Sequence, residues 1–219
     1  MSNALYAEEK ALGILGTMEF LRNDICSFSL RKLKSHHPET YRHSIRTANL
    51  CTRLYDALKL DPAGRDRMIR SALMHDIGKL SVDPRLLDQL DLLTHEEWLR
   101  LKDHCPSGLE IARQTGILPY IQEDVILFHH ENLDGTGYFG LKGDQLSLEV
   151  RIVRAADCLD TMTGFRAYGR TGDAREVFEE MYHWRDIHFD PAVLDALHRL
   201  IRPLLAKEGA DDGLHPIGE

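Results

Sequence analysis

Two adjacent polar residues, His75 and Asp76, interrupt the otherwise apolar segment 72–77. A buried carboxylate needs a partner, because removing a charge from water is costly. A divalent metal ion is a suitable partner, since a neutral imidazole supplies a nitrogen ligand and a carboxylate can bridge two ions. The alternative, an ordinary polar pair on a helix surface, is disfavoured by the apolar residues on both sides. The pair is therefore a candidate metal site.

Helical spacing relates three further residues to such a site. Lys79 follows His75 by one helical turn, so it would lie on the same face, within reach of a phosphate bound to the metals. Glu39 and His43 are four residues apart in a segment with helical periodicity up to Leu58, and both would project from one face. Taken alone, this spacing is more typical of an exposed, solvated pair than of two ligands.

Four more candidate ligands follow later in the chain: His104, the tandem pair His129-His130, and Asp157. Each has another interpretation. His104 could interact with a helix dipole, the tandem histidines could be a surface pair, and Asp157 could be an internal hydrogen-bond acceptor. Only the joint pattern favours a metal site.

The elements that must position these residues are predicted to be helices. Apolar residues recur at helical spacing in segments 45–58 and 121–128. Thr94 and Glu97 form a capping-box pattern, and Asp190 followed by Pro191 is typical of a helix start. Short β-branched runs such as 150–153 continue into helical spacing, so any sheet would be small. The sequence predicts an all-α fold.

The longest irregular stretch runs from Asn132 to Ser147 and contains four glycines, directly after the tandem histidines. A long ordered loop in a compact domain is commonly functional. Residues 1–25 are expected to form an amphipathic helical lead-in, residues 26–205 the domain that carries the candidate ligands, and residues 206–219 a mobile tail.

The composition of the 219 residues, with 43% hydrophobic and 28% charged, is that of a globular protein with one domain. The net charge of -8 argues against binding to polymeric nucleic acid, although bound metals could attract a small phosphorylated substrate. The four cysteines form no CxxC pair, and no apolar run approaches the roughly 20 residues of a membrane span. We therefore expect a cytoplasmic protein without membrane insertion.

The segment His129-His130-Glu131-Asn132-Leu133-Asp134-Gly135-Thr136-Gly137-Tyr138 resembles the HHExxDGxGYP signature of HD-GYP domains, a branch of the HD-domain phosphohydrolases. The other motifs occur in the order of that family. They are HSIRTANL at His43, LMHDIGKL at His75, DHCPSGLEIA at His104, RIVRAADCLDTMTGFRAYGR around Asp157, and FDPAVLDAL near the end. The resemblance covers roughly residues 35–200 and implies a compact helical bundle of the HD-domain type, with the glycine-rich loop near the metal site.

The resemblance also implies a ligand set and a metal content. The positions that match ligands of two or three metals, commonly iron or manganese, are His43, His75, Asp76, His104, His129, His130 and Asp157. Glu39 matches the acidic ligand associated with a third metal. Imidazole and carboxylate ligands without thiolates also suit zinc or nickel. Cys105 and Cys158 adjoin matched ligands but occupy no ligand position, and we expect both to be packing residues.

The sequence departs from the family at two places. Phe139 replaces the proline of GYP, so the loop loses a fixed φ angle and gains a large apolar side chain. The RPYR-like stretch reads Arg166-Ala167-Tyr168-Gly169-Arg170, in which Arg166 would bind a phosphate or a guanine edge unless it is simply solvated. Arg170 is a weaker candidate because Gly169 alters the spacing. With Lys79 and Tyr138, these arginines form the expected substrate-binding set.

By resemblance the function is hydrolysis of cyclic di-GMP to linear pGpG and in part to GMP. Two metals bridged by Asp76 would activate a shared water, whose hydroxide attacks phosphorus, while Lys79 stabilises the developing charge. The alternatives are a catalytically silent cyclic-dinucleotide receptor and a generic HD-domain nucleotide phosphohydrolase. Another cyclic dinucleotide, cyclic GMP-AMP, fits equally well. The amphipathic N-terminal segment favours a homodimer or a sensor protein as partner.

Overall fold

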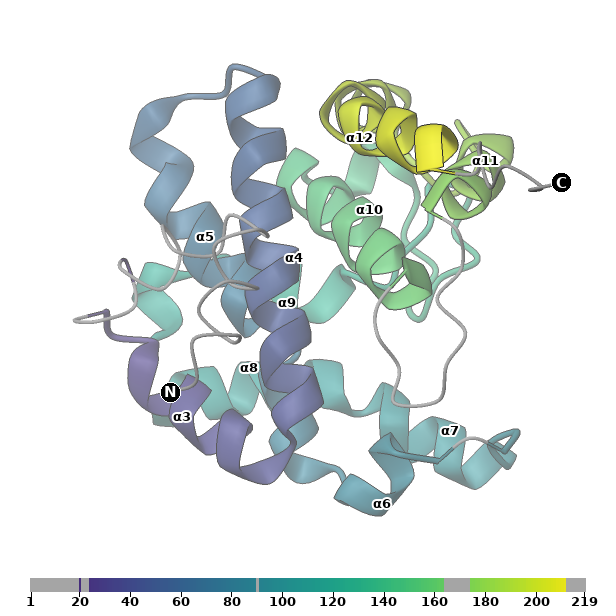
Figure 1. Cartoon of the computed structure of the whole chain (residues 1–219). Coiled ribbons are helices and arrows are strands. Elements are labelled where there is room, and N and C mark those ends of the chain that lie inside the picture. Colours follow the sequence, from purple (N-terminus) through teal and green to yellow (C-terminus); the bar gives the residue numbers. More distant parts are fainter. Residues whose placement is uncertain (1–19, 21–23, 90, 164–173, 212–219) are drawn as a thin grey trace, which may run out of the picture.

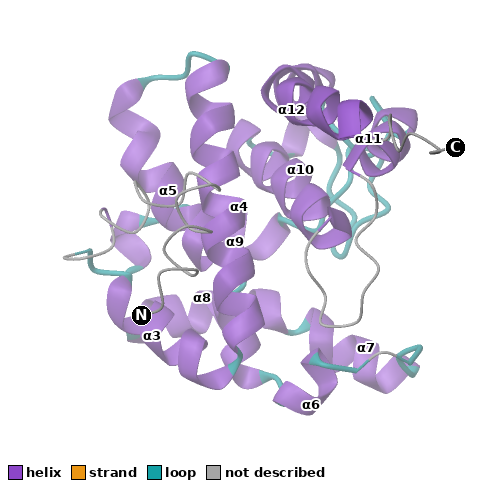
Figure 2. Ribbon diagram, in the orientation of Figure 1, coloured by secondary structure: helices purple, strands orange, loops and turns teal. Residues whose placement is uncertain are grey.

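In the computed structural model of the protein, the described residues are 20, 24–89, 91–163 and 174–211, with side chains up to residue 202. They contain no β-strand, only an isolated bridge between Arg185 and Phe189, so the expected all-α fold is confirmed (Figures 1 and 2). The described α-helices are α3 (Ser27–His36), α4 (Pro38–Ala57), α5 (Arg65–Met74), α6 (Pro84–Leu87), α7 (His95–Lys102), α8 (His104–Gln114), α9 (Glu123–Phe128), α10 (Leu148–Thr163), α11 (Ala174–His183) and α12 (Pro191–Asp211). Short 3₁₀ helices connect them at η1 (Pro62–Gly64), η2 (Ile77–Ser81), η3 (Leu118–Tyr120) and η4 (Gly143–Gln145).

Helix α4 is the element around which the bundle is built. It contacts α3, α5, α10 and α12, and in Figure 1 it runs through the middle of the molecule. The chain starts this helix at His37, whose imidazole Nδ1 accepts a hydrogen bond from the Thr40 N–H, and Pro38 occupies the first turn. Buried side chains, including Ala48 and Leu54, recur along its inner face and join the apolar core.

The local structure around His75 differs from the expected continuous helix. Helix α5 ends at Met74, and the 3₁₀ helix η2 begins at Ile77. His75 and Asp76 thus lie at the break between the two helices. Lys79 is therefore placed over Asp76, three residues earlier in a 3₁₀ turn, rather than over His75.

Both helix starts predicted from the sequence are confirmed. The Thr94 hydroxyl accepts the Glu97 N–H while the Glu97 carboxylate accepts the Thr94 N–H, which completes the capping box of α7. The Asp190 carboxylate accepts the backbone N–H groups of Ala192 and Val193 in the first turn of α12.

The ends of the chain are only partly described. Helix α12 is described up to Asp211, and the domain boundaries expected at 25 and 205 stay predictions. Residues 212–219 and most of the lead-in at 1–25 lie outside the described residues. None of the described helices is long and apolar enough to cross a membrane.

The glycine-rich loop that follows α9 is held at its base by a buried carboxylate. Glu131 is 1% exposed, and its two oxygens accept the backbone N–H groups of Phe139 and Leu141, each at 2.7 Å. At the start of the loop, the Asp134 N–H donates a hydrogen bond of 2.9 Å to the Ile187 carbonyl oxygen, which lies in the turn between α11 and α12. These hydrogen bonds connect the loop to the rest of the fold.

Gly78 permits the close contact between η2 and α8. A Cβ atom at this position would lie 1.7 Å from the His104 carbonyl oxygen and 2.6 Å from the Gly108 nitrogen. Both neighbours are backbone atoms, so they cannot rotate away as the end of a side chain would. Without a side chain at Gly78, η2 and the first turn of α8 approach one another directly.

We predict that Gly78→Ala lowers the free energy of unfolding by about 1–3 kcal/mol or more, because η2 and α8 must move apart to accommodate the methyl group. For a chain of this length, the Tm falls by about 2–4 °C per kcal/mol. Gly143→Ala is the matched control, since its Cβ would meet Leu133 at an ordinary 3.6 Å. Thermal unfolding followed by circular dichroism checks the prediction, and a Gly78→Ala protein as stable as the control would contradict it.

Candidate metal centre

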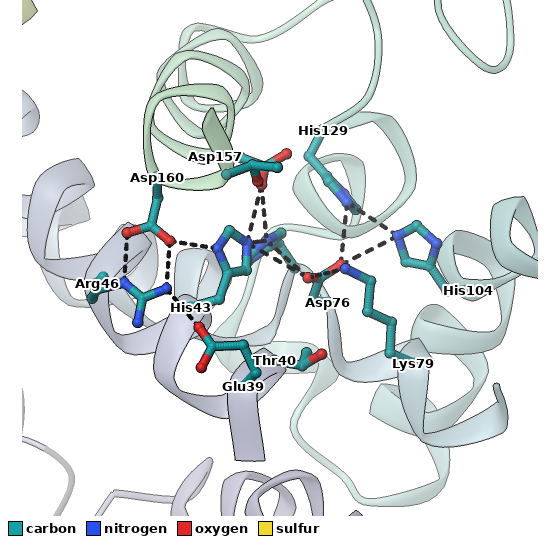
Figure 3. Close-up of polar contacts among 12 residues, drawn as sticks. Glu39, Thr40, His43, Arg46, Asp76, Lys79, His104, His129, Asp157 and Asp160 are labelled. Carbon is teal, nitrogen blue, oxygen red and sulfur yellow. Dashed lines mark hydrogen bonds and ion pairs between the residues drawn. The ribbon is translucent and has the colours of Figure 1, made fainter. Parts of the chain in front are cut away.

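Imidazole and carboxylate side chains from five segments of the chain converge in the interior of the bundle (Figure 3). They come from α4, from the break between α5 and η2, from the start of α8, from the end of α9 and from α10. The residues brought together are His43, His75, Asp76, His104, His129, His130 and Asp157. All the histidines and aspartates predicted as ligands from the sequence therefore lie in one cluster.

Asp76 lies at the centre of this cluster and is 1% exposed. Its Oδ2 atom is 3.6 Å from His43 Nε2 and 3.5 Å from His75 Nε2. Its Oδ1 atom is 3.4 Å from His104 Nε2 and 3.8 Å from His129 Nε2. Each carboxylate oxygen thus faces its own pair of imidazoles, which is the arrangement that a carboxylate bridging two metal ions requires.

The group on the Oδ2 side is completed by Asp157. His43 Nε2 is 3.3 Å from His75 Nε2 and 3.0 Å from Asp157 Oδ1. His75 Nε2 is 4.0 Å from the same carboxylate oxygen. Two imidazole nitrogens and a carboxylate oxygen therefore surround one point beside Asp76.

The group on the Oδ1 side contains His104, His129 and His130, together with the thiol of Cys105. One ligand atom from each of these four residues lies within 4.8 Å of the others. His104 Nε2 and His129 Nε2 are 3.2 Å apart. His130 also approaches the first group, since its Nδ1 atom is 3.9 Å from Asp157 Oδ2.

The hydrogen bonds on the outer edges of the imidazoles determine which nitrogen faces inward. The Nδ1–H groups of His75, His104 and His129 donate to backbone carbonyl oxygens. Their acceptors are Ala72, Leu101 and Ile126, at 2.7, 2.6 and 3.0 Å respectively. A carbonyl oxygen only accepts, so the hydrogen is on Nδ1 and the inward Nε2 carries a lone pair.

The lone pairs on these inward Nε2 atoms face one another, which is an arrangement suited to binding a cation. His104 Nε2 and His129 Nε2 are both acceptors at 3.2 Å, so no hydrogen bond joins them. Asp76 Oδ1, directed at the same two nitrogens, is buried and has no hydrogen-bond partner. A buried polar atom without a partner is costly, and a divalent metal ion would satisfy this oxygen and bind the two nitrogens as well. The donor set therefore fits the metal that the sequence predicts.

The imidazoles are in the protonation state that metal binding needs. Burial lowers the pKa of His75 and His104 and holds the pKa of His129 well below its ordinary value. Burial also lowers the pKa of His130 to about 3, although the charge of Asp157 opposes the shift. These four rings are thus neutral at pH 7 and able to act as ligands.

Charge within the cluster acts differently on the carboxylates and on His43. Burial alone would raise the pKa of Asp76, but the ammonium charge of Lys79 opposes this, and the pKa is held well below its ordinary value. Burial would lower the pKa of His43, but hydrogen bonds to Asp157 and Asp160 outweigh it and raise this pKa to about 9. In the metal-free protein, a proton on His43 therefore provides positive charge beside the carboxylates.

Lys79 pairs directly with the central carboxylate. Its Nζ atom donates to Asp76 Oδ2 at 2.6 Å. Burial would lower the pKa of Lys79, but the charge of Asp76 overcomes this and raises it. The ammonium group is therefore retained at the edge of the cluster, as its predicted role with phosphate requires.

Asp160 was not predicted as part of the site, yet it orients one of the ligands. His43 Nδ1 donates to Asp160 Oδ2 at 2.7 Å, and this carboxylate is held in turn by Arg46, whose Nε donates to Oδ1 at 2.8 Å. The signal in the sequence was its position three residues after Asp157 on the same helix, which places both carboxylates on one face.

Glu39 is the predicted ligand that the structure does not bring into the cluster. Its carboxylate accepts hydrogen bonds from Arg42 at 2.9 Å and from Arg46 at 3.0 Å. In Figure 3 the Glu39 carboxylate lies below His43 and is joined to Arg46. Its role as a ligand to a third ion stays a prediction.

The predicted substrate residues are described only in part. The Tyr138 ring lies against His130 with centroids 4.5 Å apart, and burial raises its pKa to about 12. Arg166 and Arg170 lie outside the described residues. Tyr138 therefore borders the metal cluster, and the substrate-binding roles of all three residues stay predictions.

Phe139, which replaces the proline of the family signature, supplies a hydrogen bond that proline could not make. Its backbone N–H donates to the buried Glu131 Oε1 at 2.7 Å. Its ring packs edge-on against Phe128, with centroids 5.7 Å apart. The substitution thus replaces a rigid φ angle with a hydrogen bond at the base of the glycine-rich loop.

Comparison with known proteins gives consistent relatives. Residues 30–193 match the HD domain family. A cyclic di-GMP phosphodiesterase of Pseudomonas aeruginosa is 33% identical over 200 residues, which are 90% of this chain and 45% of that protein. A 3'3'-cGAMP-specific phosphodiesterase of Vibrio cholerae is 33% identical over 76% of this chain and 36% of that protein. The chain therefore spans less than half the length of either relative.

Solved structures share the fold. An HDG"Y"P protein of Bdellovibrio bacteriovorus has a TM-score of 0.60 at 20% identity, over 73% of this chain and 51% of that one. The HD domain of the Listeria monocytogenes phosphodiesterase PgpH has a TM-score of 0.60 at 18% identity, over 80% of this chain and 98% of that one. The helical arrangement described above is thus that of known HD domains.

We predict that Asp160→Asn weakens divalent-metal binding by about 10- to 100-fold, because His43 loses the carboxylate that orients it. Calorimetric titration of the metal-free protein with Mn²⁺ measures the change. Asp56→Asn is the matched control, since Asp56 also pairs with an arginine, Arg65, but at an exposed site. Equal Mn²⁺ affinity in the two variants would show that Asp160 does not support the ligand.

Proposed function

This chain belongs to the HD-domain family, and we propose that it is a metal-dependent phosphodiesterase that hydrolyses a cyclic dinucleotide. The preferred substrate is cyclic di-GMP, and the first product is linear pGpG, with GMP as the product of a second cleavage. The observation that carries the proposal is the geometry of Asp76, whose two oxygens each face a pair of inward-directed imidazole nitrogens. Such a double site is typical of enzymes that cleave phosphate esters.

The relatives support this substrate class. The similar proteins of Pseudomonas aeruginosa and Thermotoga maritima are named cyclic di-GMP phosphodiesterases, at 33% and 30% identity. Three similar proteins of Vibrio cholerae are named 3'3'-cGAMP-specific phosphodiesterases. Because this chain matches only part of each, its substrate is inferred from the matched domain, and cyclic GMP-AMP is the second substrate to be tested.

Two metal ions fit the cluster, with iron or manganese proposed ahead of zinc or nickel. One ion would be held by His43, His75 and Asp157, the other by His104, His129 and His130, with Asp76 between them. When bound, such ions activate a water molecule for attack on phosphorus and neutralise the phosphate. A third ion at Glu39 would require this carboxylate to leave Arg42 and Arg46.

The side chains of the protein have separate tasks in this reaction. Asp76 stays ionised and fixes the two halves of the centre relative to one another. Lys79 keeps its ammonium group within 2.6 Å of Asp76, where it can stabilise negative charge that develops on the phosphoryl oxygens. Asp160 and Arg46 hold the ring of His43, so this ligand does not have to reorganise during the reaction.

Residues at the border of the centre would bind the nucleotide. Tyr138 lies beside His130, where its ring can contact a base or ribose. Arg166 and Arg170 are proposed to bind a phosphate or a guanine edge through their planar donor groups. The expected homodimer or sensor partner stays a prediction from the sequence.

The test is anaerobic purification followed by metal analysis and chromatography of cyclic di-GMP, cyclic GMP-AMP and cyclic di-AMP incubated with the protein. We expect pGpG from cyclic di-GMP when iron or manganese is supplied and none in the metal-free protein. Asp76→Ala should lose hydrolysis by about 10³-fold or more, because both ions lose a shared ligand.

Two results would contradict the proposal. Tight binding of a cyclic dinucleotide by the fully metal-loaded protein without turnover would identify a receptor instead of an enzyme. Hydrolysis confined to mononucleotides would identify a generic HD-domain phosphohydrolase. Lys32→Met on α3, outside the cluster, controls for effects of substitution as such.

A further inference from the structure

Cys105 lies inside the ligand cluster, although the sequence predicts only a packing role for it. It is the second residue of α8, directly after His104, and its side chain is fully buried. Its Sγ atom is 3.5 Å from His104 Nε2. It also lies within 4.8 Å of a ligand nitrogen of His129 and of His130. The S–H group can donate to the His104 Nε2 lone pair in the metal-free protein, and the sulfur lies among the ligand atoms of three imidazoles.

The contrast with Cys158 shows that proximity in sequence does not explain this position. Cys158 adjoins Asp157, another proposed ligand, just as Cys105 adjoins His104. The Cys158 Sγ atom, however, is directed at the Met162 sulfur, 3.5 Å away. Among the described cysteines, Cys105 alone belongs to a group of side chains that could hold a metal ion.

A second observation indicates a cation site beside two of the same imidazoles. Asp76 Oδ1 is buried and has no hydrogen-bond partner. It is directed at the nitrogens beside the thiol, 3.4 Å from His104 Nε2 and 3.8 Å from His129 Nε2. A buried carboxylate oxygen without a donor is compensated by a positive ion.

The spacing of these atoms matches the edges of a coordination polyhedron. A metal–sulfur bond of about 2.3 Å and a metal–nitrogen bond of about 2.1 Å place the two ligand atoms about 3.6 Å apart at a tetrahedral angle. The observed distance from Sγ to His104 Nε2 is 3.5 Å. Two metal–nitrogen bonds of about 2.1 Å place their nitrogens about 3.4 Å apart. His104 Nε2 and His129 Nε2 are 3.2 Å apart.

We propose that Cys105 is a thiolate ligand of the metal held by His104, His129 and His130, the position that the Oδ1 atom of Asp76 faces. The inference rests on the metal centre of the proposed function and adds a ligand to one of its two positions. On binding, the metal–sulfur bond replaces the S–H bond, and the proton passes to solvent. Thiolate is a soft ligand, so of the two metals proposed first this position favours Fe²⁺ over Mn²⁺, and it also suits the probe ions Co²⁺ and Zn²⁺.

Cobalt substitution tests the ligand without reference to activity. The metal-free full chain is titrated anaerobically with Co²⁺, and the near-ultraviolet charge-transfer band of a thiolate–Co²⁺ bond is recorded. We expect the band in the wild type and in Cys158→Ser, the matched control, and its loss in Cys105→Ser. Cys105→Ser should also lower Zn²⁺ affinity by about tenfold or more while changing Mn²⁺ affinity by less than about threefold.

X-ray absorption of the zinc-loaded wild type provides a measurement that needs no variant. A sulfur neighbour at about 2.3 Å supports the proposal, and a shell of nitrogen and oxygen alone overturns it. A charge-transfer band that persists in folded Cys105→Ser also overturns it. If the protein hydrolyses cyclic di-GMP but its bound zinc has no sulfur neighbour, Cys105 is not a ligand and the proposed function still stands. A sulfur neighbour without hydrolysis contradicts only the proposed function.

Discussion

The buried carboxylate of Asp76 is the constraint on which the rest of the site depends. An ionised group that is 1% exposed costs several kcal/mol unless positive charge and hydrogen-bond donors compensate it. Lys79 supplies one such partner at Oδ2, but Oδ1 has no hydrogen-bond donor and faces only the lone pairs of two imidazoles. The protein thus preserves, at the centre of its bundle, an acceptor-rich space that a divalent cation would stabilise.

The fold maintains this arrangement through close contacts of the backbone. The break between α5 and η2 directs His75 and Asp76 into the interior, and Gly78 lets η2 approach α8 so that His104 reaches the other oxygen of Asp76. Carbonyl oxygens at the outer edges of the imidazoles keep the inward nitrogens free of hydrogen. For these three imidazoles, the metal-binding state is therefore prepared by local helix geometry rather than formed on binding, whereas His43 has to lose a proton.

The sequence predicts the helical fold and the type of each central ligand, because helical spacing and ordered motifs are local properties. It does not predict the pairing of Glu39 with Arg42 and Arg46, the support of His43 by Asp160, or the direction of the Cys105 thiol. Each of these depends on which side chains from distant segments arrive at the same place. The placement of Lys79 over Asp76 was missed for a local reason, since periodicity did not reveal the helix break at Met74.

The most direct test of the account is anomalous diffraction, at the absorption edge of the bound metal, from crystals of the metal-loaded protein. The account predicts two anomalous peaks, one on each side of Asp76, with Oδ2 bound to the ion near His43 and His75 and Oδ1 bound to the ion near His104 and His129. A single peak, or peaks that do not contact Asp76, would contradict the claim that this carboxylate bridges a double metal centre.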